Sequence, residues 1–187
     1  MNHVSTEHRV AFERLYREHA QAIHAYCARR TGPEEAKDAT ADVFAVMWRR
    51  FAEVPQADET LPWLYGVARN VLRDRARSIR RRDRLVVKIG AQPAELAEDP
   101  EVQVVRSTEH ERILAAMEKL PELDREVLRL VEWEGLSRNQ VAAALYVSRA
   151  AIDKRITRAH KKLARHLGVT PAVERTTPVP LEEGGEA

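Results

Sequence analysis

The tightest constraint on the fold of this chain is a pair of helix-start signals in its C-terminal half. Residues 136–163 read LSRNQVAAALYVSRAAIDKRITRAHKKL. Ser137, followed three residues later by Gln140, forms a capping box, and Ser148 is a second N-cap candidate. Apolar residues at helical spacing follow both serines, and the small Ala142 suits a close helix crossing. The pattern predicts a short helix, a turn and a longer helix, which is a helix-turn-helix.

The longer helix of this pair is strongly basic, and Asp153 is its one acid. A helix N-terminus offers free backbone amides and the positive end of the helix dipole, and both favour phosphate. In helix-turn-helix proteins the second helix enters the DNA major groove, where its first residues contact bases. We therefore expect this helix to bind duplex DNA. The alternative is a structural helix pair whose charged face is only solvated.

The exposed positions of the basic helix fall into two expected roles. Residues that project away from the apolar stripe and could reach base edges are Arg149, Ala150, Asp153, Lys154 and Thr157, whereas Arg158 and Lys161 are better placed for phosphates. A carboxylate at position 153 repels phosphate but can accept a hydrogen bond from a cytosine amino group.

The N-terminal block predicts three further helices. The first ends at Gly32-Pro33, the second begins there with a proline and carboxylates in its first turn, and the third follows a polar loop with Thr60 as its N-cap. Four arginines of the third helix recur at spacings of four, four and three and form one stripe: Arg69, Arg73, Arg77 and Arg80. A cationic track beside flat or apolar surfaces suits a single nucleic-acid strand.

Two side chains near this stripe bear on its role. Asn70 lies one turn from Arg73 and can donate to or accept from a base edge. Trp63, at the start of the same helix, has two interpretations that stay open. It borders a loop in which a flipped base docks, or it pads the junction with the second helix, as Tyr65 also could.

The second helix carries Asp38 and Asp42, four residues apart, beside the apolar Val43, Phe44 and Met47. Carboxylates next to an apolar patch suit a basic, amphipathic partner helix. The alternative makes Phe44 and Met47 part of the core and leaves the acids solvated.

Together these patterns predict an all-α fold of two small helical domains. The expected ranges are 8–82 for the first domain and 109–168 for the helix-turn-helix domain. A flexible linker over 83–108 is expected between them, because Gly90, Pro93 and Pro100 interrupt the helical pattern there, and a disordered tail over 169–187.

Composition narrows the functional classes. The chain has 187 residues, 44% hydrophobic and 32% charged, without the continuous apolar run of a membrane span or a secretory signal. Its single cysteine, Cys27, cannot form an internal disulfide and fits a reducing cytoplasm. We therefore expect a cytoplasmic protein with no membrane insertion.

No catalytic constellation is recognisable in the sequence. His19, His24 and Cys27 lack the further ligands and the spacing of a metal site, and the acids of the second helix stand at a helix start, where acids are expected. No glycine-rich phosphate loop and no activated nucleophile are present. We expect no enzymatic activity, no metal and no cofactor.

The two blocks, in this order, resemble the extracytoplasmic-function (ECF) class of bacterial sigma factors, which direct RNA polymerase to promoters. The matching stretches are FERLYREHAQAIHAYCARRTG (12–32), EEAKDATADVFAVMWRRF (34–51), LPWLYGVARNVLRDRAR (61–77) and the whole of 119–163. The resemblance covers roughly residues 10–82 and 109–167. Both blocks keep the family's order and spacing, which makes the pair far more specific than either half alone.

The resemblance implies three groups of site residues. It assigns polymerase binding to Asp38, Asp42, Val43, Phe44 and Met47. It assigns the promoter minus-ten element to Trp63, Arg69, Asn70, Arg73, Asp74 and Arg77, with the loop 54–61, and the arginine stripe adds Arg80. It assigns the minus-thirty-five element to Ser148, Arg149, Ala150, Asp153, Lys154 and Arg158, to which the helix pattern adds Thr157 and Lys161.

The partners implied are core RNA polymerase and promoter DNA, both as duplex and as a melted strand. Many members of the family are held inactive by an anti-sigma protein, so such a protein is a further candidate partner. Two rivals fit less of the chain. A free-standing, dimeric DNA-binding regulator leaves the N-terminal block without a role, and a DNA-processing enzyme built on the acidic helix lacks enough ligands.

Three positions depart from the family pattern. Ala41-Asp42 stands where glutamine-glutamate is usual, so the polymerase contact loses an amide and keeps a shorter acid. Tyr146 stands where the turn usually has glycine. A left-handed tyrosine costs roughly 1–2 kcal/mol, so we expect a rearranged turn. Asp153 replaces a residue that is commonly basic or polar, which changes the expected upstream sequence.

Overall fold

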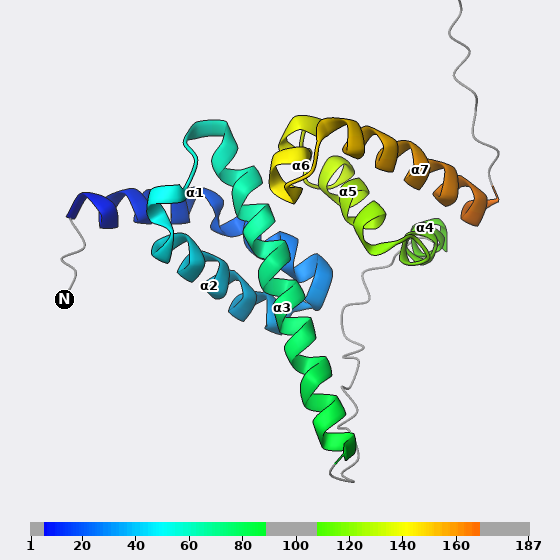
Figure 1. The fold of residues 1–187 in the computed structure, drawn as a ribbon, viewed down its shortest axis with the longest axis horizontal. Coiled ribbons are helices and arrows are strands. Elements are labelled where there is room, and N and C mark those ends of the chain that lie inside the picture. The colour runs from blue at the N-terminus through cyan, green and yellow to red at the C-terminus, as the bar shows by residue number, and fades with distance from the viewer. Residues whose placement is uncertain (1–5, 89–107, 169–187) are drawn as a thin grey trace, which may run out of the picture.

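The computed structural model describes residues 6–88 and 108–168, with side chains described over 6–82 and 108–168. In these ranges every regular element is helical, which confirms the all-α prediction of an N-terminal and a C-terminal helical domain (Figure 1). The predicted linker beyond Lys88 and the predicted tail lie outside the described residues. The domain boundaries themselves stay a prediction.

The N-terminal domain is built from three long helices and a short helical connection. Its elements are α1 (Thr6–Thr31), α2 (Pro33–Arg49), the 3-10 turns η1 (Phe51–Glu53) and η2 (Ala57–Glu59), and α3 (Thr60–Lys88). Gly32, with φ 97°, makes the sharp turn from α1 to α2, and Pro33 occupies the first position of α2, where a missing amide hydrogen costs nothing.

Helix α3 begins differently from the prediction. Thr60 has helical backbone angles and a buried side chain, and its hydroxyl donates a hydrogen bond of 2.7 Å to the Pro55 carbonyl oxygen. The expected N-cap role of Thr60 is therefore wrong, because the η2 turn runs directly into α3. The first half of α3 is buried, whereas its second half extends away from the other helices and continues past residue 82 to Lys88 (Figure 1).

The C-terminal domain contains α4 (Thr108–Glu118), α5 (Glu122–Glu132), α6 (Arg138–Leu145) and α7 (Arg149–Leu167). Both predicted caps of the helix-turn-helix are confirmed: Ser137 and Gln140 form a complete capping box on α6, and the Ser148 side chain accepts from the Ala151 amide at 3.2 Å. Gly168, in the left-handed region, ends α7.

The turn between α6 and α7 keeps its left-handed residue although that residue is tyrosine. Tyr146 has φ 54° and ψ 43°, so the expected rearrangement of the turn is wrong. Its amide donates to the carbonyl oxygens of Ala142 and Ala143, which satisfies the end of α6, and its side chain is exposed. These bonds and the free space around the ring offset the backbone strain.

The two domains pack against each other through one hydrophobic core. Ile23, Tyr26 and Leu64 from the N-terminal domain belong to the same buried cluster as Leu130 and Val141 from the C-terminal domain. Helix α3 packs on α6, and α5 faces α1 and α3 (Figure 1). Within the described ranges, no helix is long and apolar enough to cross a membrane.

Candidate nucleic-acid and polymerase interfaces

The outer face of α7 presents most of the side chains predicted to meet duplex DNA. Ser148 is used as the helix cap, and the residues exposed after it are Arg149, Ala150, Lys154, Thr157, Arg158 and Lys161. The residues of α7 that face inward are Ile152, Ile156 and Ala159, which are buried. The apolar stripe therefore turns the basic face of α7 outward.

A network of ion pairs joins the starts of α6 and α7. Arg138 donates from NH1 to Asp153 Oδ1 at 3.0 Å, and Arg149 donates from Nε to both oxygens of Asp153, at 3.2 and 3.1 Å. Arg149 NH1 also donates to Asn139 Oδ1 at 2.8 Å. Partial desolvation would raise the pKa of Asp153, but the hydrogen bonds and charges of Arg149 and Arg138 lower it overall. Asp153 is thus an ionised, engaged carboxylate.

Sequence reasoning missed Arg138 and Asn139. The signal that could have found Arg138 is its place directly after the Ser137 cap, which matches the place of Arg149 directly after the Ser148 cap. Two arginines in corresponding first-turn positions of a helix-turn-helix end up on the same side of the motif.

Further along α7, Arg155 and Arg158 reach back to a buried acid on α5. Asp124 is fully buried and accepts from Arg155 NH1 at 3.0 Å and from Arg158 Nε and NH2 at 2.8 and 2.6 Å. The hydrogen bond from Arg158 is the main cause of a lowered pKa at Asp124, and burial opposes it. Arg158, predicted to contact phosphate, therefore also fastens α7 to α5, while half of its side chain remains exposed.

The arginine stripe of α3 lies partly at the domain boundary and partly in solvent. The Arg69 side chain is only 21% exposed and its NH2 lies 3.9 Å from Glu122 of α5. Arg73, Arg77 and Arg80 are exposed, and Arg77 lies 3.6 Å from Asp74. The stripe thus begins under the C-terminal domain and leads outward along α3.

A pocket of about 280 Å³ lies where α1, α3 and α5 meet. Its wall combines arginines of both domains with two acids and includes Arg30, Arg69, Arg73, Arg125, Glu122 and Glu126. The predicted minus-ten contacts Arg69 and Arg73 therefore face the C-terminal domain across this pocket.

Around this pocket the domains are joined by buried polar contacts. The Tyr26 hydroxyl donates to Glu126 Oε1 at 2.7 Å, and Arg30 bonds to Glu126 at 3.1 and 3.2 Å and to Glu134 at 3.2 Å. Arg29 also pairs with Glu134. Burial and the nearby Glu126 charge raise the pKa of Tyr26 well above 10.

Tyr65 belongs to the same boundary. It is buried, its ring lies 5.1 Å from that of Tyr26, and burial with the charge of Glu134 raises its pKa to about 12. Of the two aromatic residues at the start of α3, Tyr65 is thus a packing residue. Trp63 is half-buried and packs against the same core.

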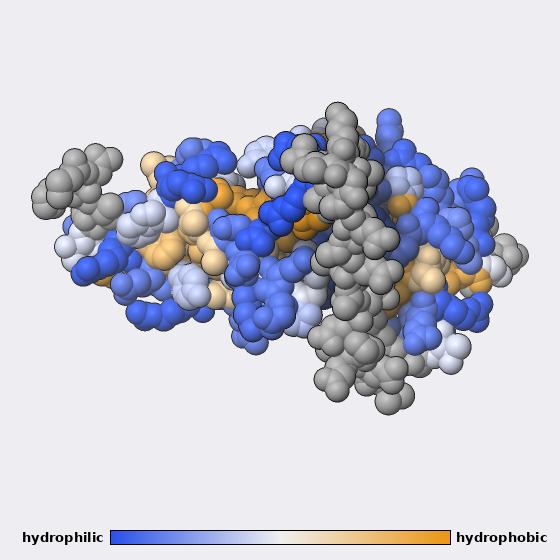
Figure 2. All heavy atoms as spheres, turned by 90° about the horizontal axis from the view of Figure 1, so that it is seen from below, coloured by the Kyte–Doolittle hydropathy of each residue, from blue (hydrophilic) through white to orange (hydrophobic). Residues whose placement is uncertain are grey.

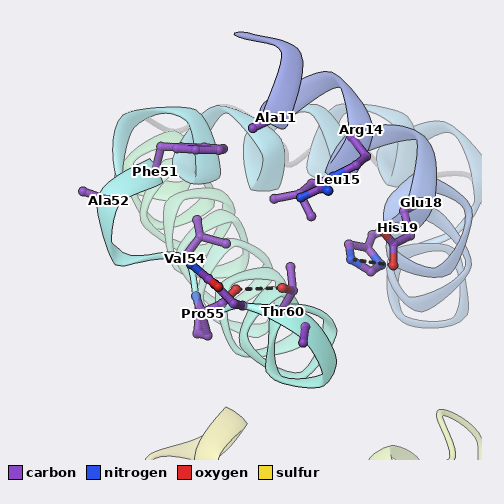
Figure 3. A pocket seen from close by; sticks show the side chains of 12 residues that line it. Ala11, Arg14, Leu15, Glu18, His19, Phe51, Ala52, Val54, Pro55 and Thr60 are labelled. Atoms are coloured by element: carbon purple, nitrogen blue, oxygen red, sulfur yellow. Dashed lines mark hydrogen bonds and ion pairs between the residues drawn. The ribbon is translucent and has the colours of Figure 1, made fainter. Parts of the chain in front are cut away.

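The loop before α3 borders a larger pocket, of about 680 Å³. Figure 3 shows its wall, in which Leu15 and His19 of α1 face Val54 and Thr60 of the loop and α3. Trp63 is not part of this wall. Burial lowers the pKa of His19 against the opposing effect of Glu18, so its ring is neutral near pH 7 and offers one donor and one acceptor.

The residues of α2 that are predicted to bind polymerase differ in how far they are buried. Val43, Phe44 and Met47 are buried in the core, whereas Asp38 and Asp42 are exposed. Asp42 accepts from Arg75 Nε and NH2 at 2.8 and 2.6 Å. Figure 2 shows hydrophobic side chains between hydrophilic ones on the side of α1 and α2.

His19 and Cys27, weighed as metal ligands from the sequence, are both buried on the inner side of α1. Among the residues that the structure describes, no group of three or more histidine, cysteine, aspartate or glutamate side chains could hold a metal ion.

Comparison with known proteins matches two protein families to this architecture. Residues 15–82 match Sigma-70 region 2, and residues 110–163 match Sigma-70 region 4. The first range contains most of α1, all of α2 and the part of α3 that carries the arginine stripe. The second range contains the helix-turn-helix.

Curated relatives point the same way. The chain is 30% identical over 158 residues to the RNA polymerase sigma factor NccH of Alcaligenes xylosoxydans xylosoxydans, covering 82% of this chain and 84% of that protein. It is 29% identical over 159 residues to the ECF RNA polymerase sigma factor BldN of Streptomyces coelicolor, covering 84% of this chain and 60% of that protein. This chain belongs to the ECF RNA polymerase sigma factors, a family that acts in transcription initiation.

Another relative is longer than this chain. The match to the probable RNA polymerase sigma factor RfaY of Xanthomonas campestris pv. campestris is 33% identical over 138 residues and covers 71% of this chain but only 34% of that protein.

Solved structures support the fold. The sigma factor RpoE, in its co-crystal with the anti-sigma factor NepR from Bartonella quintana, superposes with a TM-score of 0.61 at 22% identity, covering 85% of this chain and 98% of RpoE. CnrH, in complex with the cytosolic domain of CnrY, gives a TM-score of 0.54 at 25% identity, covering 86% of this chain and 89% of CnrH.

Proposed function

We propose that this chain binds core RNA polymerase and contacts a promoter at two separate places, as a melted strand and as duplex DNA. The observation that supports it most is the combination, in one chain, of a capped helix-turn-helix with an outward basic helix and an arginine stripe on α3. The chain itself is non-catalytic in this proposal and acts in the cytoplasm, where the polymerase works.

Duplex DNA upstream is the ligand of α7. A helix whose inner stripe is fixed by Ile152 and Ile156 can present its opposite face to a major groove. The residues proposed to lie at the minus-thirty-five element, either touching it or supporting those that do, are Ser148, Arg149, Ala150, Asp153, Lys154, Thr157, Arg158 and Lys161. The backbone amides of the first turn add a further site for phosphate.

The melted minus-ten strand is the proposed ligand of α3 and of the loop before it. Its backbone follows the arginine stripe, and the residues assigned to this element are Trp63, Arg69, Asn70, Arg73, Asp74, Arg77 and Arg80. An unpaired base needs a surface for its face and polar groups for its edge. The 680 Å³ pocket offers both, with Leu15, Phe51 and Val54 as apolar surface and neutral His19 as donor and acceptor.

Trp63 then supports this pocket from outside rather than lining it. Its packing against the hydrophobic core fixes the start of α3, so the loop 54–61 has a firm anchor. Thr60 adds a second anchor through its hydrogen bond to Pro55.

Core polymerase is the proposed partner of the exposed face of α2. Asp38 and Asp42 are the acids proposed to meet it, and the buried Val43, Phe44 and Met47 hold the helix in place beneath them. Because Asp42 already pairs with Arg75, a basic polymerase helix has to share or displace that arginine.

The closed packing of the two domains limits promoter access in this arrangement. Arg69 is mostly covered and faces Glu122, and the Arg69–Arg73 end of the stripe opens into the pocket between the domains. A melted strand can follow the whole stripe only when the C-terminal domain moves away. An anti-sigma protein is a further proposed partner, in line with the complexes of RpoE with NepR and of CnrH with CnrY.

The test is reconstitution with a bacterial core RNA polymerase. The chain is mixed with core enzyme, the complex is isolated by gel filtration, and transcription is assayed on promoters selected from randomised DNA. The proposal predicts a stable complex and specific run-off transcripts. A chain that binds DNA as a dimer but does not bind core polymerase would instead be a free-standing regulator.

A further inference from the structure

Four polar side chains at the starts of α6 and α7 form one exposed cluster, and this inference about them rests on the proposed function of α7. The cluster consists of Arg138 and Asn139 from the first turn of α6 and Arg149 and Asp153 from the first two turns of α7. Its charged members are 51%, 47% and 39% exposed for Arg138, Arg149 and Asp153. Such side chains can reach a ligand without any change in the core.

The backbone fixes where the cluster stands. Each arginine is the first residue of its helix and directly follows a serine cap, Ser137 or Ser148, whose side-chain bond sets the first turn. The left-handed Tyr146 turns the chain sharply between the two helices. The two first turns are thereby brought together, and Asp153, one turn after Arg149, lies between both guanidinium groups.

The hydrogen bonds show which groups remain available. Asp153 Oδ1 accepts from both arginines and Oδ2 accepts from Arg149, so both carboxylate oxygens are used. Arg149 has five N–H donors. Its Nε–H and one NH1 hydrogen go to Asp153 and Asn139, which leaves both NH2 hydrogens and one NH1 hydrogen for a ligand.

The charges favour the same division of roles. Two guanidinium groups this close repel each other, and a carboxylate between them removes most of that cost. The cluster keeps a net positive charge, which suits phosphate and the acceptor atoms of guanine. A cytosine amino group, in contrast, would have to compete with two arginines for the Asp153 carboxylate.

We propose that Asp153 is a positioning residue that orients Arg149 for base recognition and Arg138 for a phosphate contact, and that it does not itself read a base. Arg149 then carries the sequence preference of this part of α7. Arg138 is an additional DNA contact supplied by α6.

A double-mutant cycle on base discrimination tests whether Asp153 positions Arg149. Wild type, Asp153→Ala, Arg149→Ala and the double variant are each assembled with core polymerase. Their binding is then measured on the selected promoter and on single base-pair substitutions across its upstream element. We expect Asp153→Ala and Arg149→Ala to lose discrimination at the same base pair. The double variant should be no worse than Arg149→Ala, because only interacting residues are non-additive.

Losses at two different base pairs that add in the double variant would overturn this assignment, because Asp153 would then read a base of its own. The melting midpoints of all variants should stay close to that of wild type, since the Arg149 and Asp153 side chains are 47% and 39% exposed. If the wild-type complex binds no promoter, the proposed function itself has failed. If wild type binds and the cycle is additive, only the role of Asp153 has failed.

The salt dependence of promoter binding tests whether Arg138 contacts a phosphate. Loss of one phosphate contact lowers the slope of log K against log salt by about 0.9. We expect Arg138→Ala to show this drop and to weaken all promoter variants equally. Arg112→Ala, an exposed arginine on α4, is the matched control and should leave the slope unchanged. An Arg138→Ala slope equal to that of wild type would remove Arg138 from the interface.

Discussion

A β-carbon added to Gly66 in α3 would lie 2.5 Å from the backbone carbonyl oxygen of Ala144 in α6. A carbon atom cannot approach a backbone oxygen that closely, and the oxygen belongs to a helix that cannot yield as a side chain can. The absence of a side chain at residue 66 is therefore what lets the two domains close on each other. A substitution at residue 66 should therefore affect the closure of the domain pair without lowering the stability of the N-terminal domain.

Gly66→Ala should open the domain pair without unfolding α3. Alanine in a helix interior is favoured over glycine by about 1 kcal/mol, so α3 itself gains stability while its contact with α6 is lost. Small-angle X-ray scattering of the full chain should show a larger radius of gyration. Ser78→Ala, at an exposed position of α3 that does not line the pocket between the domains, is the control. A radius equal to wild type would show that residue 66 does not govern closure.

Glu126→Gln should weaken the same boundary by removing a charge. Glu126 is 7% exposed and accepts from Tyr26 and Arg30, whose side chain is only 8% exposed. Losing a charged partner of a buried guanidinium costs about 1–3 kcal/mol. Denaturant unfolding and scattering should both report the loss, whereas Glu132→Gln, exposed on the same helix, should change neither.

Asp124→Ala should destabilise the helix-turn-helix domain. The variant leaves Arg155 and Arg158 without the buried carboxylate that joins α7 to α5. Because both arginines reach solvent, the expected cost is about 2 kcal/mol, below that of a fully buried pair. Thermal unfolding measures it, with Glu111→Ala as an exposed control. A melting temperature equal to that of the control would mean that the ion pair does not hold α7.

Folding stability should fall in alkaline solution. An unfolded tyrosine loses its proton near pH 10. Tyr65 in the folded chain keeps its proton until about pH 12, and the pKa of Tyr26 is also raised. Between these values the folded state binds more protons than the unfolded state, so stability decreases as pH rises. Denaturant unfolding at pH 9, 10 and 11 should show this, with a shallower decline in Tyr65→Phe. An equally steep decline in that variant would contradict the role of Tyr65.

Features encoded within one helix or turn could be predicted from the sequence. The caps at Ser137 and Ser148 and the inward stripe of α7 each depend on neighbours a few residues away, and the structure confirms them. The arginine spacing likewise places Arg73 and Arg80 on one exposed side of α3.

Features that depend on residues far apart in the chain could not be predicted from the sequence. Arg30 and Glu126 are 96 residues apart, and Asp124 and Arg158 are 34 apart. No local sequence pattern therefore predicts either ion pair. Tyr65 is buried because the C-terminal domain covers it, which a single helix pattern cannot show. The expected rearrangement of the turn at Tyr146 was wrong, because two backbone hydrogen bonds and an exposed ring offset the strain of a left-handed tyrosine there.

In the proposed function, α3 holds the melted strand while α7 holds the duplex. The most direct measurement compares, for Arg73→Ala, promoter melting by permanganate reactivity with binding to intact duplex, both in the complex with core polymerase. The control is Arg82→Ala, which lies on the other side of α3 with Arg75. We expect Arg73→Ala to lose most of the melted complex and to keep duplex binding near wild type. An equal loss in both assays would contradict the claim.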